Sequence, residues 1–148
     1  MFSTPVYIKD SSQASYVVTL NTTADTDAII STDGTMIIPV MVTSVKKEPD
    51  VEDEDTGEDV NIYIQYRSSN SEEWQSLTTI QNFSTSASGS EIYTNIDLTQ
   101  LLQSEHTYQL KMRAIGQMTQ MSSSYKTFNS VTMTNLYLKF ATDWELPI

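Results

Sequence analysis

The sequence predicts an all-β protein, an antiparallel β-sandwich of about seven strands with extra segments at both ends. Three observations predict it. The composition is rich in Ser, Thr, Tyr and Val and poor in Ala, Leu and Lys, a bias that favours strands. Short apolar segments alternate with period two and are separated by polar turns about every 8–12 residues. No segment has the period of a long amphipathic helix, which argues against folds that alternate strands with helices.

Candidate strands follow one another along the chain. Asp33-Gly34 marks a turn. Pro39 interrupts the next apolar run, so we expect an edge strand or a bulge there. The segment 46–59 is a loop by composition, and the last segment is either one long strand or two short ones. The candidates are 5–10, 15–21, 33–47, 60–67, 74–81, 91–98, 107–115 and 125–140.

Two of these segments alternate clearly, and each should have a buried and an outward face. The first should form a hairpin with the strand that follows Trp74. The residues expected to be buried are Val60, Ile62, Ile64 and Tyr66 in the first and Tyr108, Leu110, Met112 and Ala114 in the second. Those expected outside are Asn61, Tyr63, Gln65 and Arg67, and Gln109, Lys111 and Arg113.

The chain of 148 residues is long enough for one domain with a substantial core. We expect an N-terminal extension with one or more strands in residues 1–30 and the sandwich in 31–130. Residues 131–148 would hold the last strand and a linker or docking tail.

Two stretches resemble the fibronectin type III family. "IYIQYRSSNSEEWQSL" is similar to that family's strand C and its hairpin, and "LLQSEHTYQLKMRA" is similar to its approach to strand F. The resemblance covers about residues 33–128. A strand B tryptophan has no counterpart in "TMIIPVMV", and Ser104 stands where the family has a corner proline. An immunoglobulin-like sandwich without a disulfide would have a similar pattern.

The resemblance implies a structural corner between Leu102 and Tyr108, which lie six residues apart. The tyrosine hydroxyl would reach back to a main-chain group a few residues upstream, and the leucine would pack beneath the crossover between the sheets.

The formal net charge of −11 argues against binding to nucleic acid or to anionic lipid, because both need a basic surface. No apolar run approaches the roughly 20 residues that span a bilayer. The chain has no cysteine, which excludes disulfides and zinc–thiolate sites.

The acidic segment 46–59 holds eight acidic residues and two lysines, a net charge of −6. Most such runs are solvated loops. The alternatives are a contact for a basic partner or a calcium site, with Asp53, Asp55 and Asp59 as the candidate ligands. EF-hand spacing is not met, because Tyr63 stands where the loop's last glutamate would be.

We find no constellation for catalysis. His106 is the single histidine, and Ser104 and Glu105 are only its neighbours in a turn. Carboxylates are concentrated in the acidic segment, which is a poor scaffold for a preorganised pair. We therefore expect a protein that is not an enzyme and has no cofactor.

Three aromatic residues are candidates for other roles. Tyr63 should lie on the outward face of its strand and could contact a partner or stack on a sugar, although a cross-strand pair is the simpler role. Trp74 should cap the core through the hairpin. Trp144 follows the expected sandwich and would pack on it, lead into another domain or dock on a neighbour.

These observations predict a non-catalytic interaction or structural module. The N-terminal stretch lacks the pattern of a secretory signal peptide, so the favoured context is the N-terminal part of a larger phage virion protein, such as a tail or head fibre, or of a surface-assembly protein. The expected location is thus the virion or the cell surface. The partners would be proteins, with a homo-oligomer left open. The alternatives are a carbohydrate-binding or calcium-dependent adhesion module of a bacterial surface protein, and an accessory domain of an enzyme.

Overall fold

The computed structural model describes residues 15–48, 51–55, 58–86 and 90–138. In this part of the chain nine strands form two open sheets, and the helical residues are the single turn at 136–138. None of the described helical structure is long and apolar enough to cross a membrane. The strands are β1 (Ser15–Thr22), β2 (Ile29–Ser31), β3 (Ile37–Glu48), β4 (Val51–Asp55), β5 (Val60–Arg67), β6 (Gln75–Phe83), β7 (Thr94–Asp97), β8 (Thr107–Gly116) and β9 (Lys126–Met133).

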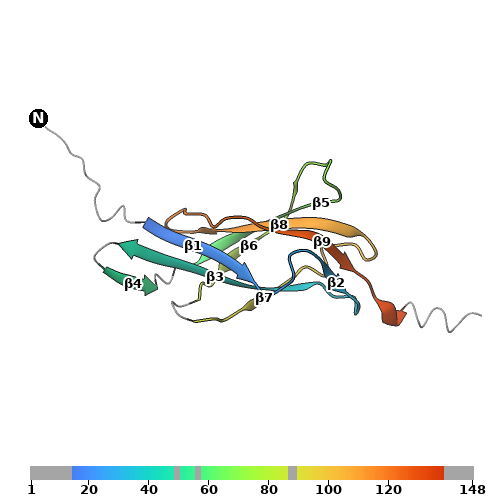
Figure 1. Ribbon diagram of the computed structural model, residues 1–148, viewed down its shortest axis with the longest axis horizontal. Helices are drawn as coiled ribbons and strands as arrows, with labels where there is room; N and C mark the ends of the chain where they lie inside the picture. Colours follow the sequence, from blue (N-terminus) through green and yellow to red (C-terminus); the bar gives the residue numbers. More distant parts are fainter. Residues whose placement is uncertain (1–14, 49–50, 56–57, 87–89, 139–148) are drawn as a thin grey trace, which may run out of the picture.

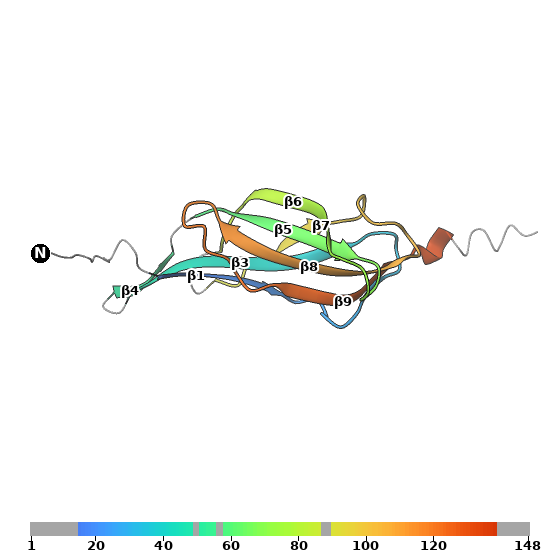
Figure 2. The same ribbon diagram turned by 90° about the horizontal axis from the view of Figure 1, so that it is seen from above.

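The two sheets form the layers of a sandwich (Figures 1 and 2). In the first sheet β3 pairs with β1 along one side and with β4 and β7 on the other. The second sheet has the strand order β2-β9-β8-β5-β6. Side chains from both sheets make one core, in which Ile38, Ile62, Leu110 and Phe128 are fully buried. The predicted all-β fold of two sheets is confirmed.

One pairing departs from the antiparallel sheet that the sequence predicted. β2 runs parallel to β9, with Ile29 opposite Val131. Parallel neighbours need a long connection, and here strands β3 to β8 lie between the two strands in the sequence. The second sheet is therefore mixed.

The core extends beyond residues 31–130. Val18 and Leu20 on β1 are buried in it, and so are Val131 and Met133 at the end of β9. β1 pairs with β3 over eight residues without a register shift, so it is a full member of the first sheet.

Pro39 lies in neither an edge strand nor a bulge. It sits on β3 opposite Asn95 of β7, in regular register. The Pro39 carbonyl accepts a hydrogen bond from Thr22 Oγ1 at 2.7 Å, so this residue's main chain faces the β1 side. The β1 ladder ends at the pair Thr22–Val40. The N and O atoms of one strand residue point to the same side, so an N–H group at Pro39 would also point toward β1. The ladder between β1 and β3 has already ended there, and proline's lack of an N–H therefore costs no ladder hydrogen bond.

Part of the acidic segment is a strand and not a loop. β4 pairs antiparallel with the end of β3, with Asp55 opposite Val45. Composition suggested a loop because like charges repel, but a strand at the edge of a sheet can place acidic residues in water.

The two strongest alternating segments form the centre of the second sheet. β5 pairs with β6, as the predicted hairpin requires, and the structure also pairs it with β8. β6 is the outer strand, and its register with β5 shifts twice. Such bulges twist an edge strand and discourage pairing with another chain.

Candidate functional site

The outer face of the second sheet collects aromatic and cationic side chains. β5 and β8 are antiparallel neighbours, and their alternate residues point away from the core. Because both strands are anchored by buried residues on the other face, these outward side chains have a fixed register. The facing pairs are Tyr63 with Arg113, Gln65 with Lys111, and Arg67 with Gln109.

Five of the side chains in this region form a continuous row, which we call the cation–aromatic ladder: Arg67, Trp74, Lys111, Tyr125 and Arg113. Arg67 Cζ lies 4.3 Å from the centre of the Trp74 ring, and Lys111 Nζ lies 4.7 Å from it. Lys111 Nζ is also 4.4 Å from the centre of the Tyr125 ring, and Arg113 Cζ is 5.1 Å from that centre. Each distance is within the range of a cation–π interaction.

The ladder is a local positive site on an acidic protein. It holds three of the eight Lys and Arg residues of a chain with a net charge of −11. Arg67 donates to neutral acceptors, the Gln109 Oε1 atom at 2.7 Å and the Glu72 carbonyl at 3.2 Å. Within the described residues, none of the three cations forms an ion pair with a carboxylate, and the buried Nε of Arg113 has no hydrogen-bond partner. Among the described residues these three cations are therefore not paired with carboxylates.

Tyr63 lies beside the ladder and borders a shallow hollow. Its side chain is 36% exposed. The hollow has a volume of about 170 Å³. Its lining combines aromatic, amide and hydroxyl groups, which suits a polar ligand. The lining residues are Tyr63, Ile64, Gln65, Ser76, Thr79, Arg113 and Tyr125.

The position of Trp74 corrects a prediction. It does not cap the core but lies under Arg67 and Lys111 on the outer face. Trp74 comes just before β6, at the end of the turn that joins β5 to β6. Tyr125 was expected only as the first residue of the strand candidate 125–140, and nothing in the sequence predicted its place on this face; it comes just before β9. The sequence did indicate that Lys111 and Arg113 point outward. It could not indicate which aromatic side chains would lie beside them.

Glu58 belongs to a different, buried site. The acidic segment was expected to be solvated, yet this residue is only 2% exposed. Its Oε1 accepts hydrogen bonds from the main-chain N–H of Met118 at 2.9 Å and of Thr119 at 2.8 Å. Its Oε2 accepts from Ser44 Oγ and from Thr119 Oγ1. One carboxylate thus joins β3 to the turn that follows β8.

The hydrogen bonds also determine the pKa of the Glu58 carboxyl group and therefore its ionisation state. Burial raises the pKa of this carboxyl, but the bonds donated by Ser44, Thr119 and Met118 outweigh it, so the pKa lies below its ordinary value. Glu58 is therefore ionised at neutral pH.

The calcium proposal gains no support from the described residues. Among them, no group of three or more His, Asp and Glu side chains could hold a metal ion. Of the candidate ligands, Asp59 is half-buried, while the side chains of Asp53 and Asp55 lie outside the described part.

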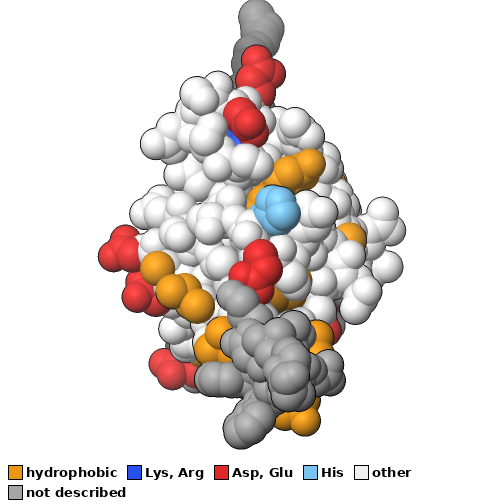
Figure 3. All heavy atoms as spheres, turned by 90° about the vertical axis from the view of Figure 1, so that its right-hand side faces the viewer, with side chains coloured by type: hydrophobic (Ala, Val, Ile, Leu, Met, Phe, Trp, Pro, Cys, Tyr) orange, Lys and Arg blue, Asp and Glu red, His pale blue; other side chains and the backbone are white. Residues whose placement is uncertain are grey.

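His106 lies at the surface, where Figure 3 shows its side chain. Its Nδ1 is 3.1 Å from the Ser104 carbonyl, and its ring lies 6.4 Å from that of Tyr108. Ser104 and Glu105 are exposed turn residues like His106 itself. The three are neighbours in one turn, as adjacency in the sequence implied.

The residues of the expected corner lie close together. The Gln103 N–H donates a hydrogen bond to the Tyr108 hydroxyl at 3.1 Å. Leu102 is 8% exposed and belongs to the core, and the Tyr108 ring meets Tyr66 edge to face at 6.0 Å. The hydroxyl thus pins the turn before β8 to the strand itself.

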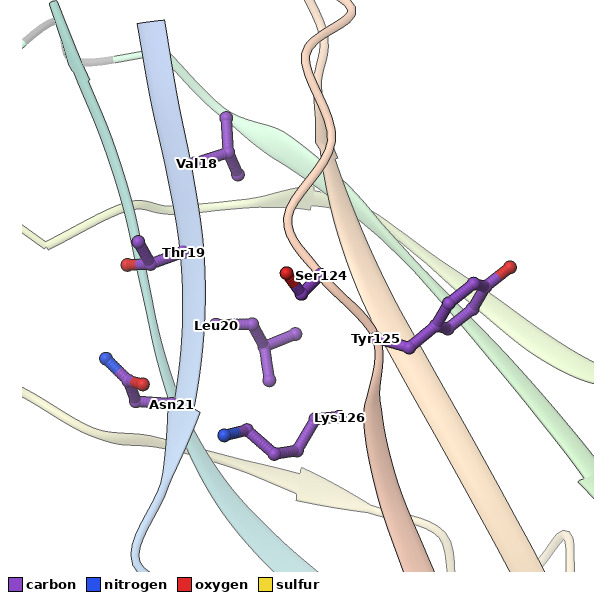
Figure 4. Close-up of a pocket in the computed structure, with 7 residues that line it drawn as sticks. All are labelled: Val18, Thr19, Leu20, Asn21, Ser124, Tyr125 and Lys126. Atoms are coloured by element: carbon purple, nitrogen blue, oxygen red, sulfur yellow. The ribbon is translucent and has the colours of Figure 1, made fainter. Parts of the chain in front are cut away.

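A second hollow lies between β1 and the segment that precedes β9. Its volume is about 230 Å³, and it is lined by residues 18–21 and 124–126. Figure 4 shows Leu20 and Lys126 pointing into this hollow and Tyr125 pointing away from it. Lys126 therefore lies apart from the cation–aromatic ladder. Trp144, the other aromatic candidate, lies outside the described residues.

Comparison with protein-family models, with curated proteins and with solved structures gives no match to this chain. The fold and the site define a β-sandwich with an aromatic and cationic outer face.

Proposed function

We propose that this chain is a fibronectin type III-like module that does not catalyse a reaction but makes contacts in a larger assembly. The favoured setting is the N-terminal part of a phage tail or head fibre protein, or of another surface assembly.

The strand order supports the family proposal. In immunoglobulin-like sandwiches strands A, B and E share one sheet and G, F and C share the other. The orders β1-β3-β7 and β9-β8-β5 follow the same scheme. The hydrogen bond from Gln103 to Tyr108 has the geometry of a tyrosine corner.

The single observation that carries the function is the cation–aromatic ladder. Trp, Tyr and Arg are the residue types enriched at the centres of protein interfaces. Here they lie together on a sheet face, held in place by one another and without compensating carboxylates among the described residues. A surface that only needs to be soluble would not require this arrangement.

The shape of the module supports a place in an elongated assembly. β1 begins near one end of the sandwich and β9 finishes near the other (Figure 1). A module with this path can connect neighbours in a line while its faces stay available for contacts. The virion setting itself rests on analogy of fold.

The setting is tested by locating the protein. Antibodies raised against the chain should label purified phage particles from the source culture. Label that is found only on the bacterial surface would refute the virion setting and favour the adhesion alternative.

A carbohydrate-binding module is the second candidate, favoured by the exposed Tyr63 beside a polar hollow. It predicts a specific hit on a panel of neutral glycans that disappears in Tyr63→Ala. Absence of any hit on the panel would remove this candidate.

A further inference from the structure

The three cations of the ladder are spaced like the side chains of an extended peptide. Arg67 on β5 lies opposite Gln109 of β8, so Arg67, Lys111 and Arg113 occupy three successive positions that are separated by two-residue steps along β8. Each such step is about 6.8 Å in an antiparallel strand. Side chains on one face of any extended polypeptide repeat at the same distance. The ladder thus matches a ligand with a charge at every second residue.

The cations are also held ready for binding. Arg67 and Lys111 both contact the Trp74 ring, and Lys111 and Arg113 both contact the Tyr125 ring. Long cationic side chains normally lose rotamer freedom when they bind, and a side chain that already rests on a ring has less to lose. The contacts therefore lower the entropic cost of ordering the site.

The same contacts disfavour a sugar as the ligand of the ladder. Sugar rings bind by stacking on a free aromatic face, and here the Trp74 and Tyr125 rings are contacted by two cations each. The groups left for recognition are the guanidinium and ammonium groups, whose natural partners are carboxylates.

We infer that the cation–aromatic ladder binds an extended acidic segment of a partner protein, with carboxylates at alternate positions, lying along β8. This inference rests on the proposed function and names the chemistry of the partner. The segment would lie across the sheet face. It would not add to the edge at β6, where two register shifts interrupt the strand.

The test uses two peptides of the same composition. The alternating probe is four Thr-Glu repeats, and the block probe is four Glu followed by four Thr. Binding is followed by the fluorescence of Trp74, in a protein that carries Trp144→Phe so that Trp74 is the single tryptophan. We expect the alternating probe to bind several-fold more tightly than the block probe, and to bind less as salt is added.

Charge variants locate the site. The double variant Arg67→Gln with Arg113→Gln should weaken binding of the alternating probe by roughly tenfold, since two of the three cations that would contact its carboxylates are lost. The single variants Arg67→Gln and Arg113→Gln are matched by Lys126→Gln, which also removes one positive charge but from the hollow beside β1, and which should leave the affinity nearly unchanged. Equal melting temperatures would show that the variants are folded.

Three results would overturn the inference: no binding of the alternating probe to the folded protein, equal affinity for the two probes, or tighter binding of an oligogalacturonate than of either peptide. Each of them leaves the proposed function open, because the labelling of particles tests that function separately.

Discussion

The carboxylate of Glu58 lies directly against the backbone of Gly116. A Cβ atom added at Gly116 would be 2.5 Å from Glu58 Oε2 and 2.6 Å from its Cδ. Gly116 ends β8, and the turn after it donates two main-chain N–H groups to the same carboxylate. The absence of a side chain at this position is what lets the carboxylate of Glu58, which comes just before the start of β5, reach the turn.

Glu58→Gln should destabilise the protein by about 1–3 kcal/mol, the usual cost of leaving a buried hydrogen-bond donor without its acceptor. The amide keeps one oxygen acceptor, but its NH₂ group faces donors. The free energy of unfolding in urea measures the effect. Glu91→Gln is the control, because Glu91 is exposed, and it should have no measurable effect. Equal stability of the two variants would show that the Glu58 contacts are not stabilising.

Gly116→Ala should also destabilise the protein, by about 1–3 kcal/mol, because the added methyl group displaces the carboxylate. The loss should shrink when Glu58 is already Ala, since nothing then occupies the space. A double-mutant cycle measures this coupling as the difference between the double variant and the sum of the singles. Additive losses would mean that Gly116 is needed for another reason.

The stabilisation from Glu58 should depend on pH. Its folded-state pKa is lowered from the ordinary 4.5, so its contribution is complete above that value and is lost as the pH falls through the folded-state pKa. Melting temperatures between about pH 7 and pH 3 give the profile. The difference between the wild type and Glu58→Gln isolates this group from the other carboxylates. That difference should narrow on acidification, and a constant difference would contradict the assignment.

Tyr108→Phe should cost about 0.5–1.5 kcal/mol, because the Gln103 N–H loses the hydroxyl that accepts its hydrogen bond. The ring remains, so packing against Tyr66 should be unchanged. Thermal unfolding measures the loss. Tyr137→Phe is a matched control at a side chain that is 77% exposed. If Tyr108→Phe and Tyr137→Phe have the same melting temperature, the hydrogen bond between Gln103 and Tyr108 contributes nothing to stability.

The alternating strands could be predicted from the sequence because side chains of a strand face opposite sides in turn. Ile62 and Ile64, and Leu110 and Met112, are buried as their spacing indicated. The parallel pairing of β2 with β9 could not be predicted in this way, because it joins segments separated by almost a hundred residues. Strand β4 in the acidic segment could not be predicted either, because the composition of that segment is typical of a loop. It is the pairing with β3 that makes it a strand.

The candidate site, too, could be predicted only in part from the sequence. The outward positions of Arg67, Lys111 and Arg113 follow from local alternation, which is a property of the chain itself. Their gathering around Trp74 and Tyr125, and the burial of Glu58 beneath the turn after β8, depend on which strands become neighbours. Alternation is set by backbone geometry over a few residues, whereas contacts between distant segments arise only when the whole core packs, and only the tertiary structure decides them.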